Sequence, residues 1–449
     1  MKKNEENSKV SEDTQSLALN EINEKEKEND NNKIEDKKDE NPIQEKIKKK
    51  AISKKKSNKS LFPYKNMCNK NKIIENDEKE KILKELKENE KNLKKLSFGD
   101  FEMVKNLSKS AVSYRTDNTF LIFQSINEII CLIYANKLEE KNNSIVSYNI
   151  IDYKKMAEIK NAHNEDITNF RYYLDKMNKK DLILSISAKD NNVKLWNIND
   201  VEFLLNINNV NRSGFLKSAC FLNYNNQIFI VTCNFIHSLN AEPIKIYDLT
   251  GNKIKEINTD NNNTFFIDTY FDNQTNINYI IIGEYGYVKS YDYNNNKKYH
   301  KYKENKHIDH YEHHSAIVIN NYDVVKLIDT SRNREIRIWD FHSADLLSKI
   351  EVSGSTYDNL YGIALLNEEY LFAGCGNSIK LIDLDNEEVI NTLVDYNYNV
   401  ISVKSVSHPK YGECLLSQDL YEGQIKLWIN KINKYKYNID LLYKKLKEE

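Results

Sequence analysis

A six-residue pattern that recurs along the chain constrains the fold more than any other feature of the sequence. The clearest copy is IRIWDF, which starts at Ile336 and alternates apolar with polar residues in the manner of a half-buried strand. Related copies are VKLWNI from Val193, IKIYDL from Ile244, VKSYDY from Val288, IKLIDL from Ile379, IKLWI from Ile425 and the weaker IVSYNI from Ile145. The chain therefore contains seven copies of one strand-like element.

The aligned aromatic or apolar residues of the copies give the period of the repeat. These expected blade-core positions are Tyr148, Trp196, Tyr247, Tyr291, Trp339, Ile382 and Trp428, and consecutive members are 48, 51, 44, 48, 43 and 46 residues apart. In the second unit, four short apolar runs follow one another: ITNFRYY, DLILSIS, VKLWNI and EFLLNI. Four strands of about five residues with their turns need about 40–50 residues, the period of a propeller blade. We therefore predict an all-β, seven-bladed β-propeller with four-stranded antiparallel blades.

The repeats resemble the WD-repeat family of β-propellers over about residues 98–433. The family's Trp-Asp dipeptide is Trp339-Asp340 in the best copy, and its Gly-His is reduced to Ala162-His163 in the second blade. In that family a histidine, a second-strand serine or threonine, a turn aspartate and the third-strand tryptophan form a hydrogen-bonded structural tetrad. The resemblance implies that the tetrad of the second blade consists of His163, Ser187, Asp190 and Trp196.

Seven third strands leave the last blade in need of an outer strand. Residues 101–107 (FEMVKNL) resemble the other outer strands and would close the ring from the N-terminal side. Residues 434–439 (KYKYNI) are the competing candidate. We favour the N-terminal strand, because residues 439–447 also read as a short helix. For residues 434–449 as a whole, a C-terminal strand and a short helix are the two alternatives.

The chain before the repeats divides by composition. Residues 1–75 are polar and almost free of aromatics, which predicts a disordered, low-complexity extension rich in Lys, Glu and Asn. Within it, residues 46–72 carry 11 Lys and no acidic residue. Residues 76–97 place apolar residues on one face at helical spacing, which predicts an amphipathic helix that docks on the protein or binds a partner.

Composition also bounds the class of protein. No apolar run approaches the ~18 residues of a membrane span, and no apolar signal region follows the N-terminal charges, so we expect an intracellular protein of the cytoplasm or nucleus. The six cysteines form no C-x-x-C pair, and five lie in or beside predicted strands, so reduced core thiols are expected. Only six of the 66 basic residues are arginines, which makes each arginine more informative than a lysine.

The sequence contains none of the common catalytic motifs, and we expect a protein that is not an enzyme and uses no cofactor. The one dense group of titratable residues is HKYKENKHIDHYEHH, His300 to His314. Its potential zinc ligands are Asp309, His310, Glu312, His313 and His314. A metal-dependent enzyme using this cluster is one alternative. Against it, the segment lacks cysteine and maps to an outer strand and the loop after it, where His314 can instead fill the position of the family histidine.

The leading interpretation is a non-catalytic scaffold that binds other proteins through its loops as part of a multiprotein complex. Arg337 replaces a lysine of the other copies, whereas Arg332 and Arg334 lie in a turn and are not explained by the repeat. Arginine and aromatic residues dominate interface hot spots. The predicted patch for an acidic or phosphorylated partner segment consists of Arg332, Arg334, Tyr285, Tyr287 and Tyr421.

A second alternative is a nucleic-acid-binding or chromatin-associated protein that uses residues 46–72 as an electrostatic arm. No small-molecule substrate is expected. The sequence does not identify the partner proteins.

Overall fold

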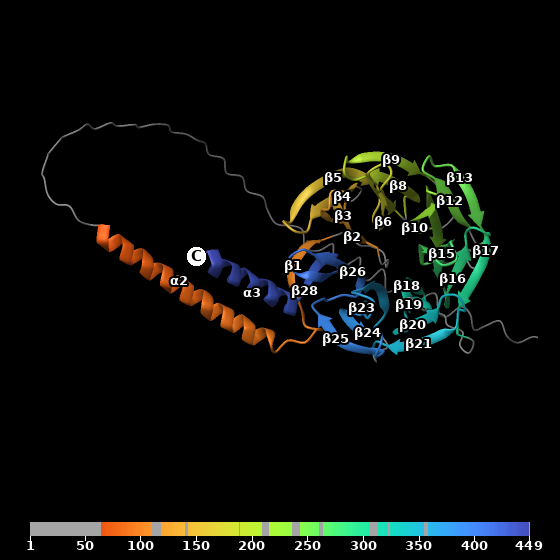
Figure 1. The fold of residues 1–449 in the computed structure, drawn as a ribbon. Coiled ribbons are helices and arrows are strands. Elements are labelled where there is room, and N and C mark those ends of the chain that lie inside the picture. Colours follow the sequence, from red (N-terminus) through yellow and green to blue (C-terminus); the bar gives the residue numbers. More distant parts are fainter. Residues whose placement is uncertain are drawn as a thin grey trace, which may run out of the picture. The chain divides into compact units, whose positions relative to one another are not determined.

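The computed structural model describes residues 64–109, 118–139, 142–187, 189–208, 215–235, 243–259, 264–304, 312–321, 324–353 and 358–448. In these ranges, 28 strands form seven four-stranded antiparallel sheets, which Figure 1 shows as blades around a ring. The predicted seven-bladed propeller is confirmed. Two units are distinguished, residues 1–68 and 69–449, and the propeller lies in the second. No helix within the described ranges is both long and apolar enough to cross a membrane.

Blades 1 to 6 are meanders of four consecutive strands, and the first strand of each lies nearest the centre of the ring (Figure 1). Blade 1 contains β2 (Phe120–Gln124), β3 (Ile130–Glu139), β4 (Asn142–Asn149) and β5 (Lys154–His163). Blade 2 contains β6 (Ile167–Asp175), β7 (Lys180–Ser187), β8 (Asn192–Asn197) and β9 (Glu202–Ile207). Blade 3 contains β10 (Phe215–Tyr224), β11 (Gln227–Phe235), β12 (Ile244–Asp248) and β13 (Lys253–Ile257).

The second half of the ring repeats this plan. Blade 4 contains β14 (Phe266–Asp272), β15 (Ile277–Glu284), β16 (Tyr287–Asp292) and β17 (Lys297–Tyr302). Blade 5 contains β18 (His313–Asn321), β19 (Val324–Ser331), β20 (Glu335–Asp340) and β21 (Leu346–Glu351). Blade 6 contains β22 (Leu360–Leu365), β23 (Tyr370–Cys375), β24 (Ser378–Asp383) and β25 (Glu388–Val394). Blade 7 contains β26 (Val400–His408), β27 (Gly412–Asp419), β28 (Gln424–Asn430) and, from the N-terminal side, β1 (Phe101–Lys109).

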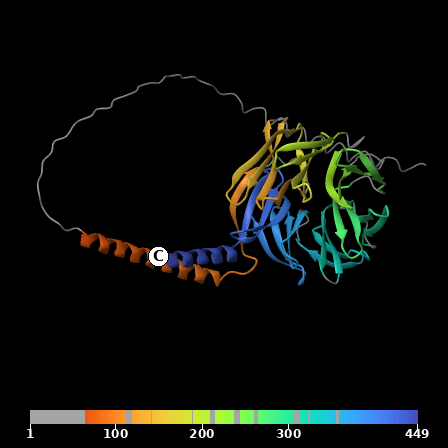
Figure 2. The same ribbon diagram turned by 45° about the horizontal axis from the view of Figure 1, so that its top comes forward.

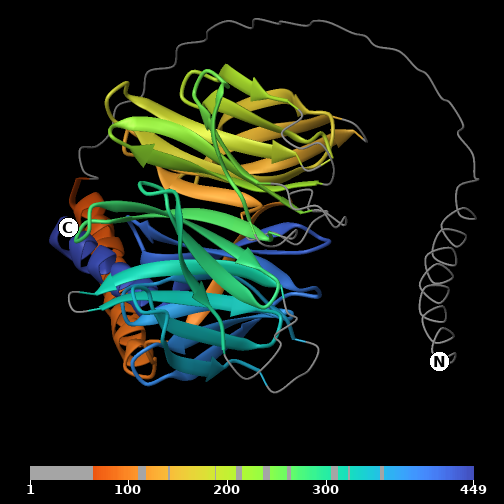
Figure 3. The ribbon, with the colours of Figure 1, turned by 90° about the vertical axis from the view of Figure 1, so that its right-hand side faces the viewer.

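The core of the propeller lies between blades. Seven buried apolar clusters fill the seven interfaces between neighbouring sheets in the described part of the chain. Figure 3 shows these sheets from the side of the ring. Six of the seven predicted blade-core positions are buried, and only Tyr148 is half-buried. Five cysteines (131, 220, 233, 375 and 414) are buried thiols, and burial raises the pKa of Cys131 to about 11. This confirms the prediction of reduced core thiols for these five residues.

The third strand of blade 5 shows how the repeat is used. In β20, Ile336 and Ile338 pack against blade 6, whereas Trp339 packs against blade 4. Both faces of this strand are buried, although the alternating pattern predicts a half-buried strand. Arg337 is only 4% exposed, and its Nε lies 3.2 Å from Oε1 of Glu304. The repeated basic residue is tolerated inside the propeller because a carboxylate compensates its charge.

The acidic or amide residue after the third-strand aromatic has a local role. In five blades its side-chain oxygen accepts a hydrogen bond of 2.8–2.9 Å from a backbone N–H in the turn to the outer strand. These residues are Asn149, Asp248, Asp292, Asp340 and Asp383. The side chain thus replaces a backbone acceptor in a tight turn. The Asp of the Trp-Asp dipeptide is therefore a turn-forming residue.

Strand β1 closes the ring, as the prediction of N-terminal closure requires. It pairs with β28 in an antiparallel register that places Phe101 opposite Asn430 and Lys109 opposite Gln424. The segment before β1 is held as well, since the Asn430 amide donates to the Phe98 carbonyl at 2.7 Å. The Phe101 ring packs edge-on against Phe372 of blade 6, 5.2 Å away. The two ends of the propeller are therefore held together by backbone and side-chain contacts.

Two helices flank this closure. Helix α2 (Tyr64–Leu93) begins earlier and ends earlier than the predicted range 76–97, and helix α3 (Lys431–Glu448) replaces the alternative of a strand at 434–439. Ile82 and Leu86 of α2 pack with Leu442 of α3, and the helices lie side by side in Figure 2. Residues 1–63, with most of the lysine-rich block, lie outside the described residues. The predicted disordered extension is therefore corrected only at residues 64–75, which are helical.

Deletion of residues 1–109 tests the closure. Without β1, strand β28 becomes an open sheet edge and the apolar contacts of Phe101 are lost. We expect the midpoint of thermal unfolding to fall by more than about 10 °C, or the protein to aggregate. The control is deletion of residues 1–63, which leaves β1 intact. Equal stability of the two deletion variants would contradict the assigned closure.

Candidate functional site

The tryptophan of blade 2 lies in a buried hydrogen-bond network. The hydroxyl of Ser185 accepts from Nε1 of Trp196 at 2.8 Å and lies 2.7 Å from Nε2 of His163. The carboxylate of Asp190 lies 3.7 Å from the other ring nitrogen of this histidine. His163, Asp190 and Trp196 of the predicted tetrad lie in this network, whereas Ser185 occupies the place predicted for Ser187. Burial lowers the pKa of His163, so its imidazole is neutral and structural.

Ser187 has a different role, which explains the error. Its hydroxyl accepts a long hydrogen bond of 3.4 Å from the backbone N–H of Asp190. Because side chains alternate along a strand, Ser185 and Ser187 point to the same face of β7. Pairing places Trp196 opposite Ile183, so that Ser185 is the nearer of the two serines to the indole.

Two other blades build related networks with different residues. In blade 5, Nε1 of Trp339 donates to Asp329 at 3.0 Å, and His313 lies 3.6 Å from the same carboxylate. In blade 7, Nε1 of Trp428 donates to the hydroxyl of Ser417 at 2.7 Å. The hydroxyl of Tyr396 lies 2.6 Å from this serine and takes the place of the histidine. Asp329 and Tyr396 were missed because their residue types differ from those that the family has in these positions.

The histidine-rich segment His300–His314 is divided among separate structures. His313 belongs to the tryptophan network of blade 5, so it fills the position that we predicted for His314. His314 lies 3.2 Å from Glu312 and packs against the ring of Tyr361. Within the described residues, no three His, Cys, Asp or Glu side chains are grouped so that they could hold a metal ion. Asp309 and His310 lie outside the described residues.

Glu312 brings two of the predicted patch residues together. Its carboxylate accepts from the hydroxyl of Tyr285 at 3.3 Å and lies 3.4 Å from Nη1 of Arg332. The backbone supports the arrangement, since Glu312 forms a β-bridge with Tyr285 and accepts from the N–H of Arg332. Burial, followed by the charge of Glu312, raises the pKa of Tyr285. We call Tyr285, Glu312 and Arg332 the blade 4–5 cluster.

The other three patch residues are placed differently. Arg334 has a φ of +70° in the turn after β19, and its carbonyl accepts from the N–H of Val352 at 3.0 Å. Tyr287 begins β16, where the ammonium of Lys301 lies 3.5 Å from the centre of its ring. Tyr421 lies two blades away, in blade 7, where its ring contacts Tyr398. The structure therefore does not unite the five predicted residues in one site.

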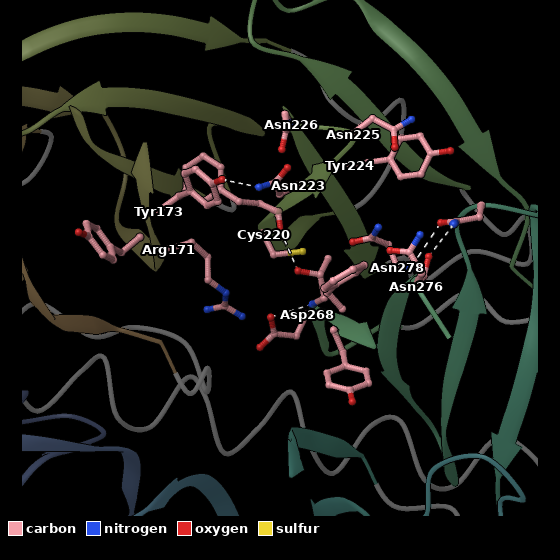
Figure 4. A pocket seen from close by; sticks show the side chains of 16 residues that line it. Arg171, Tyr173, Cys220, Asn223, Tyr224, Asn225, Asn226, Asp268, Asn276 and Asn278 are labelled. Carbon is pink, nitrogen blue, oxygen red and sulfur yellow. Dashed lines mark hydrogen bonds between the residues drawn. The ribbon is translucent and has the colours of Figure 1, made fainter. Parts of the chain in front are cut away.

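A polar pocket of about 810 Å³ lies along the first strands of blades 2, 3 and 4 (Figure 4). Arg171 of β6 extends into it, and its Nη2 donates to the carbonyl of Ile267 in β14 at 3.1 Å. Asn223 donates to the hydroxyl of Tyr173 at 2.8 Å, a contact between blades 3 and 2. These hydrogen bonds join first strands across the interfaces between blades. Arg171 therefore stabilises the wall of the pocket.

The lining of this pocket is rich in amide and phenol groups. Asn225, Asn226 and Asn276 have positive φ angles in the turns at its mouth, a conformation that asparagine tolerates. Burial, with the charge of Asp272, raises the pKa of Tyr270 to about 12, so this phenol stays protonated. Such groups suit neutral hydrogen-bonding groups of a ligand. No pattern in the sequence predicts this pocket, because its residues lie in three different repeats.

An acidic residue, Asp419, is buried at the end of β27, where its charged form is unfavourable. Asp419 is 0% exposed, and its Oδ1 accepts from the N–H of Gln424 at 2.8 Å. Its other carboxylate oxygen, Oδ2, has no hydrogen-bond partner among the described residues. Burial, aided by the charge of Glu422, raises the pKa of Asp419 to about 6.

No known family model matches this chain, and no curated protein sequence shows significant similarity to it. The relationship of the chain to known propellers therefore depends on the repeat pattern and on the geometry of the blades.

The two serines of β7 give a matched test of the tryptophan network. Ser185→Ala removes the acceptor of the Trp196 indole and a partner of His163 in a buried site, whereas Ser187→Ala removes one long hydrogen bond. We expect Ser185→Ala to lower the free energy of unfolding by about 1–3 kcal/mol, and Ser187→Ala by about 1 kcal/mol or less. Denaturant unfolding of both variants measures the difference. A larger loss of stability for Ser187→Ala than for Ser185→Ala would instead assign Ser187 to the tetrad.

Asp419→Asn tests the buried acid. Because the folded state binds the proton of Asp419 more tightly than the unfolded chain does, this residue makes stability fall as pH rises from about 4 through about 6. We expect the Asn variant to unfold about 1–3 °C higher than wild type at pH 7.5. The two proteins should unfold at the same temperature at pH 4.5. A gain of equal size at both pH values would indicate that charge is not the cause.

Proposed function

We propose that the chain is a divergent WD-repeat protein that serves as a non-catalytic scaffold within a multiprotein complex. The His163–Ser185–Trp196 network and the turn-forming Asp340 support the family, because they reproduce the hydrogen-bonded tryptophan and the Trp-Asp aspartate of its repeat. The closed ring supports the function, since propellers expose variable loops on a rigid body.

The blade 4–5 cluster is the observation that carries this proposal. Three side chains from three separate segments converge on the face that bears the turns between second and third strands, which we call the loop face. The side chain of Arg332 remains 33% exposed, and that of Glu312 is 19% exposed. Because Arg332 is the more exposed member of this pair, its guanidinium can also bind a partner carboxylate or phosphate beside Glu312. Arg332 then offers a forked donor and Tyr285 an adjacent hydroxyl.

The non-catalytic part of the proposal has separate support. The histidines that resemble catalytic residues in the sequence, His163 and His313, lie in buried tryptophan networks. A general acid or base must reach its substrate, and both side chains are fully buried. Their chemistry is that of blade stability.

Charge reversal tests the scaffold. We expect Arg332→Glu/Arg334→Glu in the tagged full-length chain to lose a subset of the proteins that co-purify with wild type, because acidic segments are then repelled. The control is Lys154→Glu, a reversal at a side chain that is 79% exposed at the start of β5, beside the turn from β4. This turn lies on the opposite face, so the full set of partners should be kept. Quantitative mass spectrometry measures the sets, and thermal unfolding verifies the fold. An unchanged set for the double variant would reject this site.

A further inference from the structure

Two exposed tyrosines form a fixed pair on the loop face of blade 7. Tyr421 is 68% exposed and Tyr398 is 42% exposed, and their ring centroids are 5.2 Å apart at an interplanar angle of 72°. A second contact joins the same two loops, because the amide of Asn397 donates to Oε1 of Glu422 at 3.1 Å. The two loops, residues 395–399 and 420–423, therefore hold each other through neighbouring residues.

The loops that carry the two tyrosines are anchored by a buried leucine. Leu420 is 3% exposed and packs with Tyr361 and Ile401 in a small apolar cluster. Its backbone N–H donates to the carbonyl of Asn399 at 2.9 Å, which joins the two loops a third time. The tyrosines are therefore exposed although their loops are anchored. Rigid, exposed aromatic rings lose little conformational entropy on binding, which is why they dominate hot spots.

The charge around the pair is negative. The two loops and the strand ends beside them contribute three carboxylates, those of Asp395, Asp419 and Glu422, and one ammonium group, that of Lys426. This lysine lies 2.9 Å from Asp395, so its charge is largely compensated. Glu422 has no cationic partner among the ion pairs of the described residues, whereas Asp419 is buried near it. A group that binds here meets an exposed aromatic face and the uncompensated charge of Glu422.

We propose that Tyr398, Tyr421 and Glu422 form a second binding site, which takes an arginine or lysine side chain of a partner protein. Cations are attracted to aromatic faces, and a neighbouring carboxylate adds to this attraction. Arginine fits best, because its flat guanidinium can stack on one ring while donating to Glu422. Anionic segments are repelled by the same groups. The site rests on the proposed scaffold function only in that its ligand belongs to a protein.

This assignment changes the role of Tyr421. The sequence groups this residue with Arg332 in a patch for acidic partners, whereas its surroundings select the opposite charge. The loop face then carries a site for an anionic group in blades 4 and 5 and a site for a cationic group in blade 7. A partner with both charges in one segment, or two partners, can use them together.

The test uses the purified full-length chain and fluorescein-labelled peptides of equal length. The probes are Arg-Gly, Gln-Gly and Glu-Gly repeats, and fluorescence anisotropy measures their dissociation constants. We expect the Arg-Gly peptide to bind most tightly and to weaken with added salt. Tyr421→Ala and Glu422→Gln should each weaken it roughly 3- to 10-fold, as the loss of one cation–π contact or one charge implies.

Two further variants separate the site from general effects. Tyr421→Phe keeps an aromatic face and should restore binding to within about twofold of wild type. Tyr443→Ala removes an exposed tyrosine of α3 and should leave binding unchanged. Equal affinity for the Gln-Gly peptide, no binding of the Arg-Gly peptide, or full binding by Tyr421→Ala would each overturn the proposal. The assay uses no co-purifying protein, so its failure is distinct from failure of the scaffold test.

Discussion

Burial of both faces of each sheet against neighbouring sheets is the constraint on which the rest of this molecule depends. A four-stranded blade such as β18–β21 has one apolar face toward blade 4 and another toward blade 6, so it cannot be stable alone. An open row of blades would expose two apolar faces at its ends, and only a closed ring removes both. The β1–β28 pairing is therefore the step that completes the core. Because β1 comes from the opposite end of the propeller sequence, unfolding of the ring must break either this seam or a whole interface between blades.

The same burial explains which polar residues the repeat keeps. A strand buried on both faces leaves little room for charge, yet Lys289 and Glu284 lie 2.9 Å apart with neither side chain exposed. Buried ion pairs of this kind add little net stability, but loss of one partner leaves an uncompensated charge. Trp196, Trp339 and Trp428 follow a related rule, since each indole N–H has a side-chain acceptor on the strand beside it. The acceptor changes from serine to aspartate, which shows that the hydrogen bond is kept and the residue type is not.

The sequence predicted the fold well because each blade has a local strand pattern, and this pattern recurs at a regular spacing along the chain. Seven weak copies at a regular period identify the propeller, and the resemblance of residues 101–107 to the outer strands identified the closing strand. Individual contacts were harder to predict. Ser185 and Ser187 are two residues apart on one strand face, and only the register of Trp196 against Ile183 separates them. The pocket beside Arg171 combines three repeats, and the split of the tyrosines between blades 4 and 7 depends on where each loop meets its neighbour.

The propeller contains positions whose residue type is constrained by packing between blades and positions whose residue type can vary. Strand residues face neighbouring blades on both sides, so a change there disturbs two interfaces. Residues of the loop face contact only the loops beside them, as Tyr285 contacts Glu312 and Tyr398 contacts Tyr421. Such contacts can change from one blade to the next without cost to the core. Sites of opposite charge on one face are a consequence of this freedom, since seven repeats of one architecture supply seven independent sets of loops.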